Sequence, residues 1–471
     1  MTATFPARTE SYDEEGIYPV IVFNGEGTQI VLEELHGKHV LPVVRIPRLS
    51  RPTEHITCHL RSAWKLPAVL LFFTPIEDGI RTSDRDVGKS THYATMEALR
   101  EGVMLRTDVG WHSVRGALAR IGRVEAEFVR RAHEQASTKC NGADPAPFSR
   151  FGWMRRLEGW INGVVHDRVL THGEIVHLNG GGGFSLVRFE TNDKPLWFKA
   201  VGGSNLREYP ITVTLAQLFP DFLPTMIAFE PTIRGWLMED VCGPTLRDSD
   251  HTPAWHTTVE RLADLQLRSI PYTNALLEAG CLDLRIPFLK SLVNSFFDLM
   301  VTLMEQQQKS SPAPLTRGQL CDVASSVSTA LQDLESLEIP DALCHRDFNP
   351  GNILVGDDRC AFTDWAEGCV GHPFLTFEYL LAFLRKSAHA ASESRLREEY
   401  TKKWLSVSTA EAICRAQKLS PLVAVFAHAV STSAWCDADR LSAPGAAGYL
   451  RSLTRRMKHE ADSLSQRSLA C

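Results

Sequence analysis

One run of residues, Cys344 to Trp365, constrains what this chain can fold into more than any other part of the sequence. It begins Cys-His-Arg-Asp-Phe-Asn-Pro-Gly-Asn-Ile-Leu-Val and ends Phe-Thr-Asp-Trp. Two carboxylates, Asp347 and Asp364, and the amide of Asn352 therefore flank short apolar segments. Phosphoryl transfer from a nucleotide requires an acceptor for the hydroxyl proton of the substrate and oxygen ligands for the magnesium ion that bridges the phosphates. The run predicts the catalytic centre of a kinase.

The apolar residues within this run predict a β-hairpin. One strand leaves the motif at residues 352–355, a turn follows at residues 356–358, and a second strand returns at residues 361–363. Such a hairpin brings Asn352 and Asp364 to the same side, as shared metal ligation requires. Asp and Asn are also common in ordinary loops. The complete spacing followed by a strand is, however, far more specific than an isolated His-x-Asp.

The segment from His345 to Asn352 resembles the catalytic loop of the aminoglycoside phosphotransferase and choline kinase superfamily, small-molecule kinases with the protein-kinase-like fold. The segment from Asp364 to Glu367, Asp-Trp-Ala-Glu, resembles the metal motif of that family. The resemblance implies that Asp347 is the catalytic aspartate and that Asn352 and Asp364 are magnesium ligands. It places Glu367 at the second acidic position of the family's metal motif, as a third metal residue that reaches the ion through water. It covers about residues 150 to 440.

Beside the catalytic aspartate, His345 is counted among the catalytic residues, and we expect it to hold the loop by hydrogen bonds. Arg346 departs from the family pattern, because it replaces the usual glycine and matches the His-Arg-Asp of protein kinases. Asp364, in contrast, is followed by Trp365 and not by the Phe-Gly of protein kinases. The small-molecule branch is favoured, and a protein kinase is an alternative.

A small β-rich nucleotide lobe is predicted upstream of the motif. Residues 173–178 and 184–189 are two strand signals with the run Asn-Gly-Gly-Gly-Gly between them. Glycines let the backbone approach phosphate groups and present N–H groups to them. Gly181, Gly182 and Gly183 are therefore predicted to bind the nucleotide, and a simple mobile turn is the alternative.

The third strand of this lobe, residues 195–201, contains Lys199 where kinases hold the lysine that contacts the α- and β-phosphates. Such a lysine is more often a solvent-facing residue. Glu208, at the start of the next helix, is the predicted ion-pair partner. Two more strands, at residues 223–229 and 234–238, complete a five-stranded sheet. Glu239 and Val241 then lie at the hinge, where backbone groups are predicted to contact the purine.

Composition limits the class of protein. The chain has 471 residues, 44% of them hydrophobic, which suggests two or three domains. The net charge of −6 gives no electrostatic footprint for nucleic acid. Eleven scattered cysteines without a Cys-x-x-Cys predict reduced thiols in a cytoplasmic protein. No signal peptide is evident and the longest apolar runs are short, so we expect no membrane partner.

Residues 1–140 are predicted to form an accessory α/β domain that ends at a linker rich in Pro, Gly and Ala, residues 136–149. Its layout weakly resembles a Nudix domain without the acidic metal-binding helix, so we expect no hydrolase activity. His55 and His59 lack a third ligand, and no metal site is expected there. The strand signals are at residues 18–23, 29–35, 40–46 and 68–74. The helical signals are at residues 52–64, 91–100 and 114–133.

The predicted fold class is α+β: an α/β domain at 1–140, a kinase small lobe at 150–242 and a mainly helical large lobe at 243–471. Helical signals in the large lobe lie at residues 255–267, 288–307, 318–337, 374–389, 392–405, 422–436 and 449–464. The predicted function is a kinase that uses ATP (or GTP) and Mg²⁺ to phosphorylate a hydroxyl of a small molecule. Aminoglycoside-like compounds, other natural products, amino alcohols and sugars are the acceptor classes.

Two points stay open at this level. Acidic residues such as Glu367, Glu378, Asp437 and Asp439 are candidates for receiving a cationic acceptor, although a structural role for each alone is the simpler interpretation. A pseudokinase that recruits a partner through the N-terminal domain is the alternative from a different class, and magnesium-dependent ATP binding without turnover would favour it. The sequence does not predict the oligomeric state.

Overall fold

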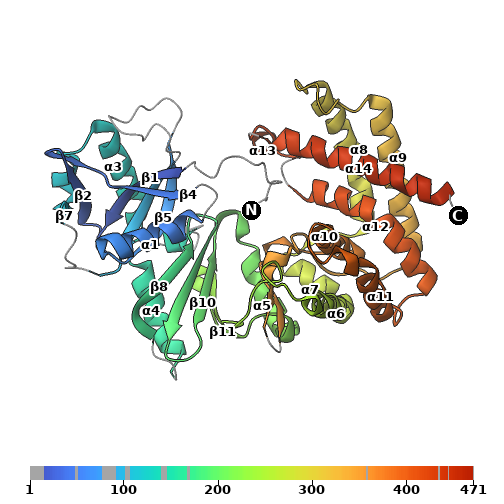
Figure 1. The fold of residues 1–471 in the computed structure, drawn as a ribbon, viewed down its shortest axis with the longest axis horizontal. Coiled ribbons are helices and arrows are strands. Elements are labelled where there is room, and N and C mark those ends of the chain that lie inside the picture. Colours follow the sequence, from blue (N-terminus) through green and yellow to red (C-terminus); the bar gives the residue numbers. More distant parts are fainter. Residues whose placement is uncertain are drawn as a thin grey trace. The chain divides into compact units, whose positions relative to one another are not determined.

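The computed structural model is shown in Figure 1. It describes residues 15–47, 51–76, 92–100, 107–138, 146–166, 170–356, 359–432, 435–443 and 445–469. The chain divides into two compact units, the first made of Met1–Tyr209 and Thr225–Asp240 and the second of Pro210–Pro224 and Val241–Cys471.

The N-terminal part of the first unit contains a seven-stranded mixed sheet with the main order β3-β2-β1-β6-β5, to which β4 and β7 add beside β1 and β2. Its strands are β1 (Glu15–Phe23), β2 (Gln29–Leu35), β3 (Lys38–Val40), β4 (Val43–Pro47), β5 (Ala68–Pro75), β6 (His92–Ala98) and β7 (Val109–Ser113). Its helices are α1 (Pro52–Trp64), α2 (Val114–Leu118) and α3 (Arg123–Ser137). The strands and helix predicted for this part are largely present, and the expected α/β composition is confirmed.

Alternate residues of β1 point to opposite faces of this sheet, and both faces are buried. Val20 and Val22 belong to one apolar core, to which α1 contributes Ile56. The intervening Ile21 belongs to a second core, to which α3 contributes Phe128. Burial on both sides explains why β5 reads as an unbroken apolar run.

Three predictions for this part are wrong in detail. Residues 91–100, predicted as a helix, contain strand β6, because the segment pairs with β1 on one side and β5 on the other. Such pairing outweighs the helix propensity of its Ala, Met and Glu residues. The helix predicted at 114–133 is two helices, and Gly122 is the N-cap of the second. The strand predicted at 40–46 is divided between β3 and β4.

The first unit also contains a five-stranded antiparallel sheet with the order β11-β12-β10-β9-β8. Its strands are β8 (Leu170–Asn179), β9 (Phe184–Thr191), β10 (Leu196–Val201), β11 (Met226–Glu230) and β12 (Gly235–Glu239). Helix α4 (Trp153–Val164) precedes this sheet, and α5 (Glu208–Leu218) follows β10. The predicted five-stranded sheet is confirmed.

One apolar core runs through both sheets of the first unit. It joins Phe23 and Phe128 of the N-terminal part to Trp153 of α4 and to Phe189 and Phe198 of the five-stranded sheet. The N-terminal part and the five-stranded sheet are thus packed together as one body. Residues 139–145 of the predicted linker lie outside the described residues.

The second unit is mainly helical. Its helices are α6 (Thr252–Ser269), α7 (Thr273–Glu278), α8 (Ile286–Glu305), α9 (Arg317–Ser336), α10 (Phe374–Leu384), α11 (Glu393–Trp404), α12 (Ala410–Ser431), α13 (Ala438–Leu441) and α14 (Ala446–Leu469). Its short strands are β13 (Leu282–Leu284), β14 (Ala342–His345), β15 (Ile353–Val355), β16 (Cys360–Phe362) and β17 (Gly368–Gly371). A five-stranded antiparallel sheet followed by a helical unit is the predicted kinase-like α+β architecture.

Two helices of this unit need comment. Helix α12 was expected to start at Leu422, but it begins at Ala410 and continues through Pro421. Helix α8 is, in the part of the chain that the structure describes, the one helix long and apolar enough to cross a membrane. It packs against α9, α12 and α14, with Phe296 and Met300 fully buried, as a core helix of a bundle does.

Candidate active site

The hairpin predicted within the motif is present in the second unit. Strands β15 and β16 pair in antiparallel fashion, with Ile353 opposite Phe362. The backbone N–H of Thr363 donates to the carbonyl oxygen of Asn352 at 2.9 Å, and the Thr363 hydroxyl donates to the same oxygen at 3.1 Å. These bonds bring Asn352 and the residue before Asp364 to the same end of the hairpin. The turn residues 357 and 358 lie outside the described residues.

Asp347 is held by three side-chain donors. Asn349 donates from its amide nitrogen to Oδ1 at 3.0 Å, and the Tyr379 hydroxyl donates to the same oxygen at 2.9 Å. The amide nitrogen of Asn352 lies 3.3 Å from Oδ2 and 2.9 Å from the backbone oxygen of Asp347. Hydrogen bonds to a carboxylate fix its orientation. A fixed carboxylate suits the orientation of a substrate hydroxyl.

His345 stabilises this loop through hydrogen bonds of its ring. Its Nδ1 accepts the backbone N–H of Asp347 at 3.1 Å, so Nε2 carries the proton and donates to the carbonyl oxygen of Thr363 at 3.1 Å. Burial lowers the pKa of the imidazole, although the Asp347 and Asp364 carboxylates act in the opposite direction. The neutral ring therefore links the loop before Asp347 to the residue before Asp364. The structure places His345 as a support of the loop, as expected from the sequence.

The two predicted metal ligands offer the donor atoms that magnesium prefers. Asn352 uses its amide nitrogen on Asp347, which leaves the amide oxygen as its ligand atom. Asp364 has φ 67° and ψ 51°, a left-handed conformation that is uncommon outside glycine. Magnesium is usually held by one or two protein oxygens together with substrate phosphates. One carboxylate and one amide oxygen at the end of a single hairpin fit that requirement.

Glu367 has a different partner. Its carboxylate forms an ion pair with the guanidinium of Arg346, and the Arg346 backbone N–H donates to the Glu367 carbonyl oxygen at 3.0 Å. Arg346 also donates to the carbonyl oxygen of Ser431 in α12, at 2.8 Å. Arg346, the feature shared with protein kinases, thus has a structural role in this chain. In the described residues, no group of three or more His, Cys, Asp or Glu side chains forms a metal site.

Lys199 and Glu208 lie together in the first unit. Lys199 Nζ is 2.6 Å from Glu208 Oε1, and the two residues are 9% and 1% exposed. The rings of Phe184 and Trp236 lie 5.4 and 5.7 Å from the ammonium group. Glu208 is the first residue of α5, and Pro210 falls in the first turn, where proline is tolerated. The side chain is therefore buried beside a carboxylate and aromatic rings, in contrast to an ordinary solvent-facing lysine.

The glycine loop joins β8 to β9. Gly181 has φ +129°, and a side chain at Gly181 or Gly182 would meet no atom within 4 Å. The Gly183 carbonyl oxygen accepts the N–H of Gly202 at 2.9 Å. Packing within the chain thus gives no reason for glycine at position 182, whereas close approach of a ligand would give one.

The hinge residues fall on either side of a unit boundary. Glu239 ends β12, and its N–H donates to the Thr225 carbonyl oxygen at 3.0 Å. Val241 begins the main segment of the second unit. A Cβ atom added at Gly356 would lie 2.7 Å from the Val241 carbonyl oxygen, so the backbone at Gly356 packs closely on Val241. Lys199, Glu208 and the glycine loop belong to the first unit, and the loop of Asp347 belongs to the second.

Sequence reasoning missed several residues of the site. Tyr379 of α10 touches Asp347, but nothing in its local sequence predicts this. Asn349 lies within the recognised motif, and it also accepts a hydrogen bond from Arg247 at 2.7 Å. Thr376 accepts the backbone N–H of His345 at 3.0 Å. Only Asn349 had a usable signal, namely its place between Asp347 and Asn352.

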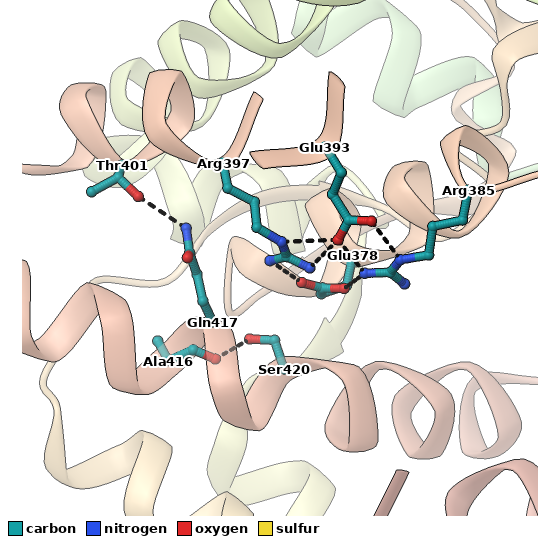
Figure 2. A network of polar contacts seen from close by, with 8 residues as sticks. All are labelled: Glu378, Arg385, Glu393, Arg397, Thr401, Ala416, Gln417 and Ser420. Carbon is teal, nitrogen blue, oxygen red and sulfur yellow. Dashed lines mark hydrogen bonds and ion pairs between the residues drawn. The ribbon is translucent and has the colours of Figure 1, made fainter. Parts of the chain in front are cut away.

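Glu378 is not an isolated charge. Its side chain is buried and forms ion pairs with Arg397 at 2.6 Å and with Arg385 at 3.2 Å. Both arginines also bind Glu393, so that the four side chains form a closed network between α10 and α11 (Figure 2). These contacts favour the simpler of the two interpretations of Glu378, a structural role, because two guanidinium groups already bind its carboxylate.

A cavity of about 170 Å³ lies among α10, α12 and α14. Tyr379 forms part of its wall, and the same side chain stacks on His428 with ring centroids 5.8 Å apart. His428 Nε2 lies 2.8 Å from the Tyr449 hydroxyl, and burial lowers the pKa of this histidine to about 4. The cationic lining residues are Arg385, Lys386 and Arg456. Because Tyr379 lines the cavity and its hydroxyl donates to Asp347, the cavity lies next to the Asp347 carboxylate.

Residues 302–416, which contain the catalytic loop and the hairpin, match the model of the phosphotransferase enzyme family. The resemblance drawn from the motif is thus confirmed, and so is the prediction that the chain is a phosphotransferase. No curated protein matches this chain over its sequence.

Several solved structures resemble this chain. An ethanolamine kinase from Plasmodium vivax is 12% identical, with 70% of this chain and 94% of that chain covered and a TM-score of 0.46. A choline kinase from Cryptosporidium parvum is 10% identical, with 67% and 97% covered and a TM-score of 0.46. A spectinomycin phosphotransferase, solved with ADP and spectinomycin, is 14% identical, with 66% and 98% covered and a TM-score of 0.39.

Proposed function

We propose that this chain transfers the terminal phosphoryl group of ATP or GTP to a hydroxyl of a small molecule, with Mg²⁺ bound at Asn352 and Asp364. The observation that carries the proposal is the Asp347 carboxylate, held by Asn349, Asn352 and Tyr379 at the end of the hairpin that presents Asp364. The family of residues 302–416 supports the same reaction.

The roles of the chain's own groups follow from their surroundings. Asp347 accepts the hydrogen bond of the attacking hydroxyl and orients it for transfer. Lys199, fixed by Glu208, supplies a positive charge for the nucleotide phosphates. Magnesium, when bound, neutralises the charge that develops on the transferred group. The backbone of the glycine loop provides N–H donors to the phosphates.

We further propose that the acceptor occupies the cavity beside Tyr379 and is neutral or anionic. The cavity wall carries three cationic side chains and a single carboxylate, Glu378. Glu378 is paired with Arg385 and Arg397, and Arg385 is also paired with Glu393, so Lys386 and Arg456 are the cationic groups outside this network. A polycationic aminoglycoside would meet like charges there, which disfavours binding. Neutral sugars, polyols and hydroxylated natural products, or hydroxy acids, fit the lining better.

The N-terminal part is proposed to keep a Nudix-like shape without the corresponding chemistry. Helix α1 carries a single acidic residue, Glu54, and therefore lacks the acidic cluster that a metal-dependent hydrolase needs. We propose that this part is accessory to the kinase.

The proposal is tested with radiolabelled ATP and GTP and a panel of hydroxyl compounds that spans cationic, neutral and anionic members. A neutral or anionic member should become labelled, and Asp347→Asn should reduce the rate by about 10²- to 10⁴-fold. Asp264→Asn, which changes an exposed carboxylate paired with Lys403, serves as the matched control and should keep full activity. Unchanged turnover in Asp347→Asn would remove Asp347 from the reaction, and labelling of cationic members alone would overturn the proposed acceptor class.

A further inference from the structure

His177 connects the glycine loop to the N-terminal part of the first unit. It lies near the end of β8, is 1% exposed, and makes two hydrogen bonds with different parts of the chain. The N–H of Leu70, in the N-terminal strand β5, donates to His177 Nδ1 at 3.1 Å. His177 Nε2 lies 3.0 Å from the hydroxyl of Ser185, in the strand that follows the loop. One side chain thus touches both strands of the loop hairpin and the neighbouring sheet.

The direction of these bonds is fixed by the protonation state of the ring. Nδ1 accepts a hydrogen bond from a backbone N–H, so it carries no proton. Burial lowers the pKa of His177 to about 3, and the ring is therefore neutral near pH 7. The single proton lies on Nε2, which donates to Ser185. A ring with the opposite tautomer would carry its proton on Nδ1 and would lose the bond from the Leu70 N–H.

The glycine loop packs directly on this ring. A side chain at Gly180, the first glycine of the loop, would lie 2.8 Å from His177 Cε1 and 3.2 Å from Leu70 Cδ2. The indole of Trp153 in α4 lies on the ring as well, with centroids 6.0 Å apart. Gly180 is therefore required by contact with His177 and Leu70, in contrast to Gly182, which meets nothing.

Two other contacts join the same parts of the first unit. Arg61 of α1 donates to the carbonyl oxygen of Ile175 in β8. The carboxylate of Glu97 in β6 accepts the backbone N–H of Gly152, at the start of α4, at 2.9 Å. Strands β5 and β8 are each the last strand of their sheet, so His177 binds a backbone group at the edge of one sheet and Arg61 binds a backbone group at the edge of the other.

We propose that His177 is a positioning residue through which the N-terminal part holds the glycine loop in the conformation that binds nucleotide. The inference rests on the proposed function, because it takes the loop at residues 180–183 as the phosphate-binding element. It gives the N-terminal part a defined task in the reaction: this part sets the affinity for the nucleotide without contacting it. A buried histidine that only stabilises the fold would make the same contacts, so the test must separate stability from nucleotide affinity.

Three substitutions remove the two bonds selectively. Ser185→Ala removes only the bond from Nε2. His177→Asn keeps an acceptor close to the position of Nδ1 for the Leu70 N–H but loses the donor to Ser185. His177→Gln keeps a donor close to the position of Nε2 but loses the acceptor for Leu70. As the matched control, His133→Asn removes a bond of 2.9 Å to the Gly27 carbonyl oxygen, within the N-terminal part and away from the loop.

The readouts are the dissociation constant for Mg-ADP by calorimetry, the KM for each substrate, the melting temperature, and hydrogen exchange at residues 180–185. Each of the three variants should weaken Mg-ADP binding by about three- to tenfold, the worth of one net hydrogen bond. The KM for nucleotide should rise in parallel, while the KM for the acceptor stays the same. Exchange at residues 180–185 should become faster. His133→Asn should lower the melting temperature with none of these effects.

The outcomes are distinct. If the three variants melt at lower temperature but bind Mg-ADP like the unaltered protein, His177 has only a structural role and the inference is wrong. If only Ser185→Ala and His177→Asn weaken binding, the hairpin itself positions the loop and the N-terminal part has no share in it. If the unaltered protein binds no nucleotide, the proposed function fails first. Should the His177 variants not fold, Ser185→Ala, which removes one oxygen atom, still tests whether the ring positions the loop, and unchanged affinity for Mg-ADP would then contradict the inference.

Discussion

The catalytic loop in the second unit and the glycine loop in the first unit are supported in different ways. Asp347 is held by neighbours from its own motif, Asn349 and Asn352, and by one tyrosine from α10. The glycine loop is held by His177, which depends on Leu70, more than a hundred residues earlier in the chain. The catalytic loop is thus supported mainly by residues close to it in sequence, whereas the support of the glycine loop includes a residue of the N-terminal part.

The largest expected effect is that of removing the N-terminal part, which packs against the five-stranded sheet. Removal of residues 1–145 should leave no soluble, folded protein, because the truncation exposes the faces of α4 and β8 that share the common core. Each apolar side chain returned to water costs about 1.5–3 kcal/mol, and a whole domain is stable by only about 5–15 kcal/mol. Soluble yield and circular dichroism measure the outcome. A truncated chain that melts cooperatively would show that the nucleotide sheet is independent after all.

The next effect concerns the buried ion pair of the first unit. Glu208→Gln leaves the Lys199 ammonium buried without its carboxylate partner, which should lower the free energy of unfolding by about 3–5 kcal/mol. Phosphoryl transfer should fall as well. The double variant Lys199→Met with Glu208→Gln should recover much of the stability but none of the activity. Full activity in the double variant would exclude the pair from nucleotide binding.

A pH effect distinguishes the accessory part from the catalytic loop. Burial raises the pKa of Glu97 from 4.5 to about 7, against the Gly152 hydrogen bond and the charges of Arg155 and Arg156. The folded state therefore binds more protons than the unfolded state between about pH 4.5 and 7. Stability should fall as pH rises through this window, by up to about 3 kcal/mol.

The measurement is the melting temperature of the first unit from pH 4.5 to 8, compared between the unaltered protein and Glu97→Gln. The glutamine variant should remove most of the slope, since it cannot ionise. Glu127→Gln, an exposed carboxylate on α3, is the control and should leave the slope in place. An unchanged slope in Glu97→Gln would assign the effect to another group.

The smallest expected effect lies at the catalytic loop. Tyr379→Phe removes one of the three donors to Asp347 and should reduce kcat by about three- to tenfold, with little change in melting temperature. Tyr449→Phe removes a hydroxyl bound to His428, one step further from Asp347, and should have a weaker effect on kcat. Equal effects of the two variants would show that Tyr379 acts through the cavity and not through Asp347.

The same comparison explains what the sequence could predict. The spacing of His345, Asp347, Asn352 and Asp364 determines a local hairpin, so the catalytic loop could be derived from residues close in sequence. Long amphipathic helices were also predictable, for example α8 and α9. The five-stranded sheet was also predictable, because its strands show alternating apolar and polar residues and a glycine run separates two of them.

The failures arose where distant residues decide the outcome. Strand β6 has helix-forming residues but pairs with β1 and β5, and only the tertiary structure reveals this. The ion pair of Glu367 with Arg346 also depends on the folded loop and could not be derived from the motif, and a role of Glu367 at the metal stays a prediction. His177 and Tyr379 act across long separations in sequence, and no local pattern marks either of them.

Asp364 shows how conformation restricts the residue type at the proposed metal position. Its backbone is left-handed, a conformation that Gly adopts without steric cost and that Asp and Asn adopt more readily than most other residues. Of these three, Asp alone supplies a carboxylate. Glycine there would relieve the backbone and raise stability by about 1 kcal/mol while removing the proposed ligand. Directed evolution for heat resistance alone would consequently tend to select inactive protein at this position.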